Sequence, residues 1–132
     1  MEKNNTKIGF IGAGYMGYGM AYNLLNRKIP LSVIAHKNRK PIDKLIKQGA
    51  VESISFKEIA NFSNVIVMCV TNTKVALKIA KDILPHLKSS SLFIDITTHH
   101  STGSIDMNNL FSSKKIRYIE SPVMGGPVQA KQ

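Results

Sequence analysis

Short apolar runs alternate along the chain with segments in which apolar residues recur every three or four positions. The short runs predict β-strands, and their continuous apolarity suits a sheet that is covered on both faces. We expect strands at residues 7–11, 31–35, 64–70, 92–95 and 117–120, with a short, weak strand near 51–54. This alternation is typical of βαβ units around a parallel sheet.

The segments between the predicted strands have helical periodicity. The first helical face gathers Met16, Met20, Ala21 and Leu24. A longer apolar stripe runs from Val75 to Leu84, and Pro85 marks its end. We expect a short helix over residues 41–48, where Gly49 suits a left-handed C-cap, and another helix after Ser101. No linker or internal repeat divides the chain, so residues 1–132 are expected to form one domain.

Three glycines directly follow the first predicted strand and open the next helix. They belong to the run Gly12-Ala13-Gly14-Tyr15-Met16-Gly17. In a βαβ unit the first glycine permits a tight turn, the second lets the backbone approach a pyrophosphate, and the third lets helix and strand pack closely. The N–H groups of the helix N-terminus then face the phosphates. We therefore expect a Rossmann-type α/β fold, a doubly wound, mostly parallel sheet in three layers, that binds a dinucleotide through these six residues.

Two other interpretations of the glycine turn can be compared with the same residues. The phosphate loop of nucleoside triphosphatases needs Lys and then Ser or Thr after its last glycine, and Tyr18-Gly19 stands there instead. That class of protein is excluded. A tight turn that binds no ligand stays open.

The loop after the second predicted strand is basic. NAD-binding proteins usually carry an acidic residue there, which accepts hydrogen bonds from the ribose hydroxyls. This chain has His36-Lys37-Asn38-Arg39 instead, and Lys37 and Arg39 could pair with a 2′-phosphate. These four residues therefore favour NADP(H), with NAD(H) as the second choice, and they argue against FAD and S-adenosylmethionine. A solvated basic loop without a ligand is the alternative.

Composition changes this interpretation little. The formal net charge is +10, but 15 of the 18 basic residues are lysines scattered along the whole chain, which does not favour a nucleic-acid partner. The longest apolar runs are too short to span a membrane, and the polar start is unlike a signal peptide, so we expect a cytoplasmic protein. Cys69 suits a buried structural thiol. His99-His100 suits a surface loop or a helix start, and no metal site is expected.

The opening of the chain resembles the β-hydroxyacid dehydrogenases, the family of 3-hydroxyisobutyrate dehydrogenase, tartronate semialdehyde reductase and 6-phosphogluconate dehydrogenase. The run Ile8 to Gly17, followed by Met20-Ala21-Tyr22-Asn23-Leu24, is similar to the family pattern Gly-x-Gly-x-Met-Gly-x-x-Met-Ala-x-Asn-Leu. This pattern is far more specific than three glycines, and the resemblance covers nearly the whole chain.

Three later segments extend the resemblance and imply further site residues. Val70-Thr71-Asn72 falls where the family has a loop beside the cofactor. Asp95-Ile96-Thr97-Thr98 is similar to the family's Asp-x-Ser-Thr, which implies that Thr98 lies near the nicotinamide ribose. The segment from Glu120 to Pro127 resembles Asp-Ala-Pro-Val-Ser-Gly-Gly, which implies that Met124, Gly125 and Gly126 bind the substrate carboxylate. A thioether cannot donate the hydrogen bond of the family's serine, so binding would rest on the backbone of the two glycines.

The resemblance implies an NADP(H)-preferring oxidoreductase that transfers hydride to or from a short-chain 3-hydroxy acid. It also implies that the general acid/base lysine and the helical C-terminal domain, which binds substrate and usually forms the dimer, are not among these residues. The catalytic residue is therefore unknown, and a homo-oligomer stays open. We expect residues 1–132 alone to bind cofactor with little or no turnover. A stand-alone nucleotide-binding or sensing module without catalysis is the alternative.

Overall fold

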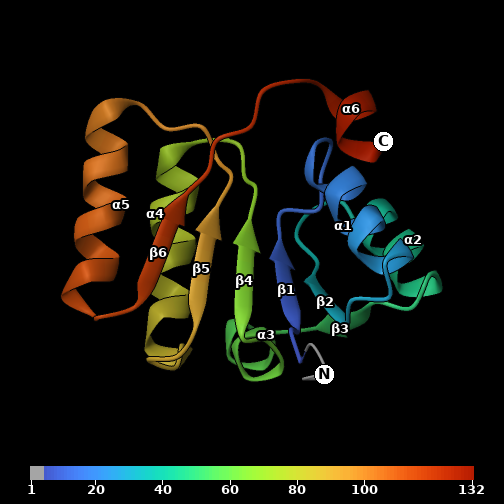
Figure 1. Cartoon of the computed structure of the whole chain (residues 1–132), viewed down its shortest axis with the longest axis horizontal. Helices are drawn as coiled ribbons and strands as arrows, with labels where there is room; N and C mark the ends of the chain where they lie inside the picture. Colours follow the sequence, from blue (N-terminus) through green and yellow to red (C-terminus); the bar gives the residue numbers. More distant parts are fainter. Residues whose placement is uncertain (1–4) are drawn as a thin grey trace.

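The computed structural model describes residues 5–132 and places every strand of this part of the chain in one parallel sheet (Figure 1). The strands are β1 (Ile8–Ile11), β2 (Leu31–Ile34), β3 (Val51–Ser53), β4 (Val65–Met68), β5 (Leu92–Asp95) and β6 (Arg117–Glu120). Their order in the sheet is β3-β2-β1-β4-β5-β6, and each neighbouring pair runs parallel. All six predicted strands are confirmed, with ends trimmed by up to two residues.

The helices connect successive strands, except α6, which follows β6. They are α1 (Gly17–Asn26), α2 (Lys40–Lys47), α3 (Phe56–Phe62), α4 (Thr73–Ile83), the 3₁₀ turn η1 (Leu84–His86), α5 (Ser101–Ser113) and α6 (Pro127–Lys131). The helices expected from the apolar stripes are confirmed as α1, α2, α4 and α5. The two short helices α3 and α6 were not predicted.

Both unpredicted helices are too short to show a convincing apolar stripe, but each carries a signal at its start. The hydroxyl oxygen of Ser55 caps α3 by accepting from the N–H of Glu58 at 3.1 Å. Ser followed three residues later by Glu is a known helix-start pattern. Proline at the first position of α6, Pro127, is another such signal.

Two apolar clusters lie on opposite faces of the sheet and make three layers. One cluster joins β4 and β5 to α3, α4 and α5 through buried residues that include Ile59, Ile66, Ala76, Phe93 and Phe111. The other joins β1 and β2 to α1 and α2 through residues that include Phe10, Ala21, Leu31, Val33 and Leu45. The chain is therefore a doubly wound Rossmann-type α/β fold, as the strand pattern predicted.

The order of the strands reverses between β1 and β4. From β1 the chain proceeds through β2 to β3 at one edge of the sheet. From β4 it proceeds through β5 to β6 at the other edge. Open α/β sheets bind ligands at such a reversal, beyond the carboxyl ends of the strands. The loops at this edge are 12–16, 35–39, 54–55, 69–72, 96–100 and 121–126.

The segment after β6 runs along this edge to α6, which packs on α1 on the far side of the reversal (Figure 1). The amide of Asn23 in α1 donates to the carbonyl oxygen of Ala130 at 3.0 Å. Gly19 of α1 lets the α6 backbone approach, because a Cβ there would lie 2.9 Å from the carbonyl carbon of Ala130. Within residues 5–132 no helix has the length and apolarity needed to cross a membrane.

Candidate functional site

The three glycines of the turn between β1 and α1 are needed for different reasons, as the atoms that an added Cβ would meet at each position show. Gly12 has φ +92°, and a Cβ there would overlap the carbonyl oxygen of Cys69. A Cβ at Gly17 would overlap the carbonyl oxygen of Gly12. A Cβ at Gly14, in contrast, would meet no atom of the described chain within 4 Å. Packing thus explains the first and third glycines, while the second faces open space.

That open space lies where helix α1 begins. The N–H of Tyr18 donates to the carbonyl oxygen of Gly14 at 3.0 Å, so the first helical hydrogen bond starts from Gly14. The N–H groups of the first helical turn have no partner inside a helix and point outward from its start. Ala13 is buried at 4% exposure, whereas the side chain of Tyr15 is exposed. A pyrophosphate fits here, because the absent side chain and the N–H groups share one location.

The basic loop after β2 contains an acidic partner that sequence reasoning missed. His36, Lys37, Asn38 and Arg39 are all exposed, as expected for a loop that meets a ligand or solvent. Arg39 donates to Glu52 of β3 at 2.8 Å and to Asp43 of α2 at 3.1 Å. The hydrogen bond to Glu52, then that to Asp43, raises the pKa of Arg39, and Arg39 lowers the pKa of Glu52.

Because of this ion-pair network, Lys37 and Arg39 are not equally available to pair with a 2′-phosphate. The guanidinium of Arg39 is already engaged by two carboxylates. Lys37 has no ion pair within residues 5–132, so its ammonium is the available cation of the loop. Only the strand register of the structure reveals Glu52: residue 52 pairs with Val33 of β2 and so lies near the loop that follows that strand.

In the loop after β4, some polar groups make hydrogen bonds within the fold and others face solvent. The N–H of Val70 donates to the hydroxyl oxygen of Thr97 at 3.1 Å. Asn72 caps α4, with its side-chain oxygen accepting from the N–H of Val75 at 3.0 Å. Thr71 is exposed. The loop thus lies at the carboxyl edge where the resemblance placed it, and Asn72 has a structural contact of its own.

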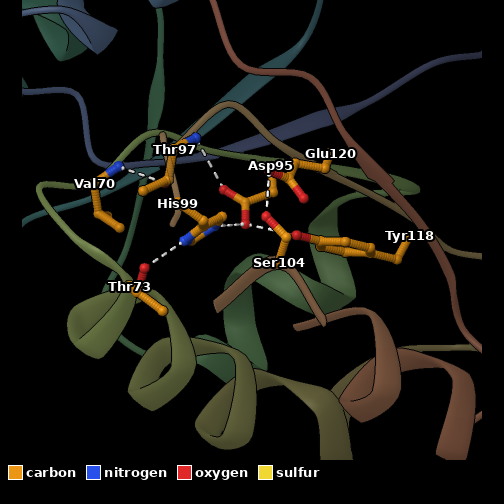
Figure 2. Close-up of polar contacts among 8 residues, drawn as sticks. All are labelled: Val70, Thr73, Asp95, Thr97, His99, Ser104, Tyr118 and Glu120. Carbon is orange, nitrogen blue, oxygen red and sulfur yellow. Dashed lines mark hydrogen bonds and ion pairs between the residues drawn. The ribbon is translucent and has the colours of Figure 1, made fainter. Parts of the chain in front are cut away.

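A buried polar network stands at the ends of β4 and β5 (Figure 2). Asp95 accepts from the N–H of Thr97 at 3.0 Å, from the hydroxyl of Tyr118 at 2.9 Å and from Nε2 of His99 at 2.7 Å. The other imidazole nitrogen, Nδ1, lies 2.9 Å from the hydroxyl oxygen of Thr73. Burial, and then the hydrogen bond to Asp95, raises the pKa of Tyr118 far above its ordinary value. Each polar group of this cluster therefore has a partner.

The expectation of a surface loop does not hold for the side chain of His99. Its side chain, like that of Asp95, has 0% exposure, because it points inward between β5 and α4. His100 does start a helix: its Nδ1 accepts from the N–H of Gly103 at 3.1 Å and caps α5. The sequence could not separate the two histidines, because burial depends on the helix that packs over the loop.

Thr73, His99 and Asp95 form a hydroxyl–imidazole–carboxylate chain, the order found in nucleophilic triads. Access rules out that chemistry here. Thr73 is buried, and a Cβ on Gly103 would lie only 2.8 Å from its hydroxyl oxygen. Thr73 is only 9% exposed and its hydroxyl is already bonded to His99, so we interpret the network as one that holds the loops together.

Between the buried side chains of Thr97 and His99, Thr98 is exposed. At the neighbouring strand end Cys69 is half-buried, and burial raises the pKa of its thiol, with the charge of Asp95 as a second cause. Raising the thiol pKa suppresses the reactive thiolate, which agrees with a structural role. Among residues 5–132 no group of three metal-binding side chains is found.

The segment expected to bind the substrate carboxylate is the one that leads into α6. Met124 is fully exposed at 100%, and Gly125 has φ +119°. The N–H of Gly126 donates to the side-chain oxygen of Gln129 at 2.9 Å, so this N–H is already used to start α6. Glu120, at the end of β6, accepts from the hydroxyl of Ser104 at 2.8 Å.

Comparison with known proteins adds to this geometry. The model of the family described as the NAD binding domain of 6-phosphogluconate dehydrogenase matches residues 7–132. A relative, 2-(hydroxymethyl)glutarate dehydrogenase of Eubacterium barkeri, is 27% identical over 96% of this chain and 42% of its own length.

Two solved structures are similar in fold. The 3-hydroxyisobutyrate dehydrogenase of Mycobacterium tuberculosis, with L-serine, superimposes with a TM-score of 0.89 at 24% identity, over 96% of this chain and 43% of that one. Psf3 in complex with NADP+ and 2-OPP gives 0.85 at 26% identity, over 94% of this chain and 45% of that one. The chain thus spans less than half the length of these relatives.

Proposed function

Because the chain belongs to the family of the NAD-binding domain of 6-phosphogluconate dehydrogenase, an oxidoreductase domain, we propose that its cofactor is NADP(H) and its reaction hydride transfer with a short-chain 3-hydroxy acid. The observation that carries the proposal is the turn at Gly14, where open space and the first N–H groups of α1 coincide. The relative that acts as a 2-(hydroxymethyl)glutarate dehydrogenase supports the class of substrate.

The pyrophosphate would be held by residues 12–17. The backbone N–H groups at the start of α1 would donate to its oxygens, and Gly14 would leave room for it. On the adenosine side, His36, Lys37, Asn38 and Arg39 would surround the 2′-phosphate, with the Lys37 ammonium as its main ion-pair partner.

The nicotinamide half would lie over the ends of β4 and β5. There Val70, Thr71 and Asn72 would form one wall, and the exposed hydroxyl of Thr98 would bond to the ribose. When bound, the nicotinamide supplies the hydride-transfer chemistry. The chain's own residues orient the cofactor, and Met124, Gly125 and Gly126 lie on the segment that would border the substrate.

We further propose that residues 1–132 form one dinucleotide-binding domain of a cytoplasmic protein whose partners are small molecules. The general acid/base is not assigned to any residue of this chain. The alternative function, a stand-alone nucleotide-binding or sensing module, shares the same cofactor site and differs only in having no turnover.

The test is a pair of titrations with NADPH and NADH, followed by fluorescence and by thermal unfolding. We expect NADPH to bind at least about tenfold more tightly, a difference of about 1.4 kcal/mol. A ligand at about 100 times its Kd should stabilise the fold by about 2.7 kcal/mol. Equal or tighter NADH binding would contradict the cofactor preference, and binding of neither would contradict the cofactor site itself.

Turnover is measured separately, with NADPH and short semialdehyde acids. We expect residues 1–132 alone to bind cofactor and to reduce these acids slowly or not at all. Steady turnover by this chain would refute that expectation and the module interpretation together.

A further inference from the structure

The imidazole of His99 connects the two loops that border the nicotinamide half of the proposed cofactor site. Its Nε2 lies 2.7 Å from Asp95, at the end of β5, and its Nδ1 lies 2.9 Å from the hydroxyl of Thr73, at the start of α4 (Figure 2). An imidazole with its proton on Nε2 donates to the carboxylate and accepts from the hydroxyl, so one ring satisfies both neighbours.

A further hydrogen bond joins the same two loops. Thr97 accepts from the N–H of Val70 at 3.1 Å, and its own N–H donates to Asp95 at 3.0 Å. The segments 70–73 and 95–99 are therefore connected by two hydrogen bonds, one accepted by Thr97 and one by His99. A buried network in which every polar group has a partner is rigid, because breaking one hydrogen bond leaves a buried polar group with neither a protein partner nor water to bond to.

This network flanks Thr98 on both sides. The side chains of Thr97 and His99, its neighbours on either side, are buried and hydrogen-bonded. Thr98 lies between them and is exposed at the carboxyl edge of the sheet. Releasing His99 would free the peptide on one side of Thr98 and let its hydroxyl turn away.

We propose that His99 is a positioning residue: by bonding to both Asp95 and Thr73 it holds the Thr98 hydroxyl toward the nicotinamide ribose. The inference rests on the proposed cofactor site. His99 itself touches neither cofactor nor substrate, because its side chain has 0% exposure. It acts through the loop, and the effect of replacing it is confined to the nicotinamide half of the ligand.

The effect can therefore be measured as a ratio of affinities for two ligands, which a purely structural role of His99 would leave unchanged. NADPH is compared with adenosine 2′-phosphate 5′-diphosphate, which keeps the adenosine, the 2′-phosphate and the pyrophosphate but lacks the nicotinamide and its ribose. In His99→Leu we expect NADPH affinity to fall about tenfold and the affinity for the nicotinamide-free analogue to change less than about twofold. Thr73→Val removes one of the two contacts and should give a smaller selective loss.

Four further variants make the result specific. Gln can place its amide where Nε2 lies, so His99→Gln should recover most NADPH affinity through Asp95. Thr98→Ala should reproduce the selective loss, and adding His99→Leu to it should cause little further change. Ile83→Ala, a buried residue at the opposite end of α4 from Thr73, controls for lost stability and should leave the ratio of the two affinities unchanged.

The outcomes separate the two proposals. Equal weakening of both ligands in His99→Leu, no weakening, or the same selective loss in Ile83→Ala overturns the role of His99 while the cofactor site stands. A wild-type chain that binds neither ligand overturns the proposed function, and this inference falls with it.

Discussion

The absence of a side chain at Gly14 is needed for the proposed ligand, whereas at Gly17 it is needed for the fold. Its added Cβ would meet no atom within 4 Å, whereas that of Gly17 would overlap the carbonyl oxygen of Gly12. We expect Gly14→Ala to change the free energy of unfolding by less than about 0.5 kcal/mol, as at open surface sites, while NADPH binding weakens at least about tenfold. Gly17→Ala should destabilise the fold by about 1–3 kcal/mol through overpacking.

Urea unfolding and NADPH titration of the same two variants check this contrast. If Gly14→Ala binds NADPH as the wild type does, the pyrophosphate lies elsewhere.

Lys37 and Arg39 have the same charge but different surroundings. Because Glu52 and Asp43 already engage Arg39, we expect Lys37→Ala to lower the preference for NADPH over NADH more than Arg39→Ala does. Glu52→Gln releases one partner of the guanidinium and should raise NADPH affinity. Titration with both cofactors measures the preference. Lys44→Ala, which removes an exposed lysine of α2, is the matched control and should leave it unchanged.

Tyr118 makes part of the alkaline stability depend on one half-buried hydroxyl. Its pKa is raised from 10.0, through burial and the hydrogen bond to Asp95, so the unfolded chain ionises first. The neutral phenol therefore stabilises the fold fully below about pH 10, and this stability is lost as the pH rises above that value. Tyr118→Phe should flatten this part of the decline.

Urea unfolding between about pH 9 and about pH 11 measures the slope of stability against pH. Tyr15→Phe alters an exposed phenol, 85% accessible, and should keep the wild-type slope. A slope that Tyr118→Phe leaves untouched would show that this hydroxyl ionises equally in the folded and unfolded chain.

At the scale of elements, α6 depends on α1 for its position. It has five residues, too few to be stable alone, and it docks through the amide of Asn23 and the absent side chain of Gly19. We expect Asn23→Ala to speed amide exchange in residues 128–132 about fivefold, the equivalent of one lost hydrogen bond. Gly19→Ala should act in the same direction, because its methyl group pushes the α6 backbone away.

Hydrogen exchange followed by mass spectrometry resolves this segment. Asn26→Ala changes an exposed residue at the end of the same helix and should leave exchange in α6 as it is. If all three variants exchange alike, α6 is held by something other than these two contacts.

At the scale of the whole molecule, repulsion between like charges opposes folding. The chain has a formal net charge of +10, and its exposed ion pairs, which include Arg39 with Glu52 and Lys78 with Asp82, use only part of the basic residues. Screening should weaken the repulsion more than it weakens a few surface pairs. We expect the midpoint of thermal unfolding to rise by about 2–5 °C between about 20 mM and about 500 mM NaCl. A falling midpoint would mean that the ion pairs outweigh the repulsion.

The sequence by itself determined the sheet, the main helices and the glycine turn. These features follow from local properties, namely the period of apolar residues and the backbone freedom of Gly12. The order of strands and helices then left the carboxyl edge of the sheet as the place for a site. Local signals also existed for α3, at Ser55 and Glu58, although the apolar pattern missed it.

Only the tertiary structure decided which polar groups meet. Arg39 and Glu52 are 13 positions apart, Thr73 and His99 are 26 apart, and Asn23 and Ala130 are 107 apart. No periodicity records such pairs, because they depend on strand register and on how helices pack over loop ends. The same packing buried His99 and left Thr98 exposed, so the sequence located the proposed site while the fold assigned its side chains to binding or to support.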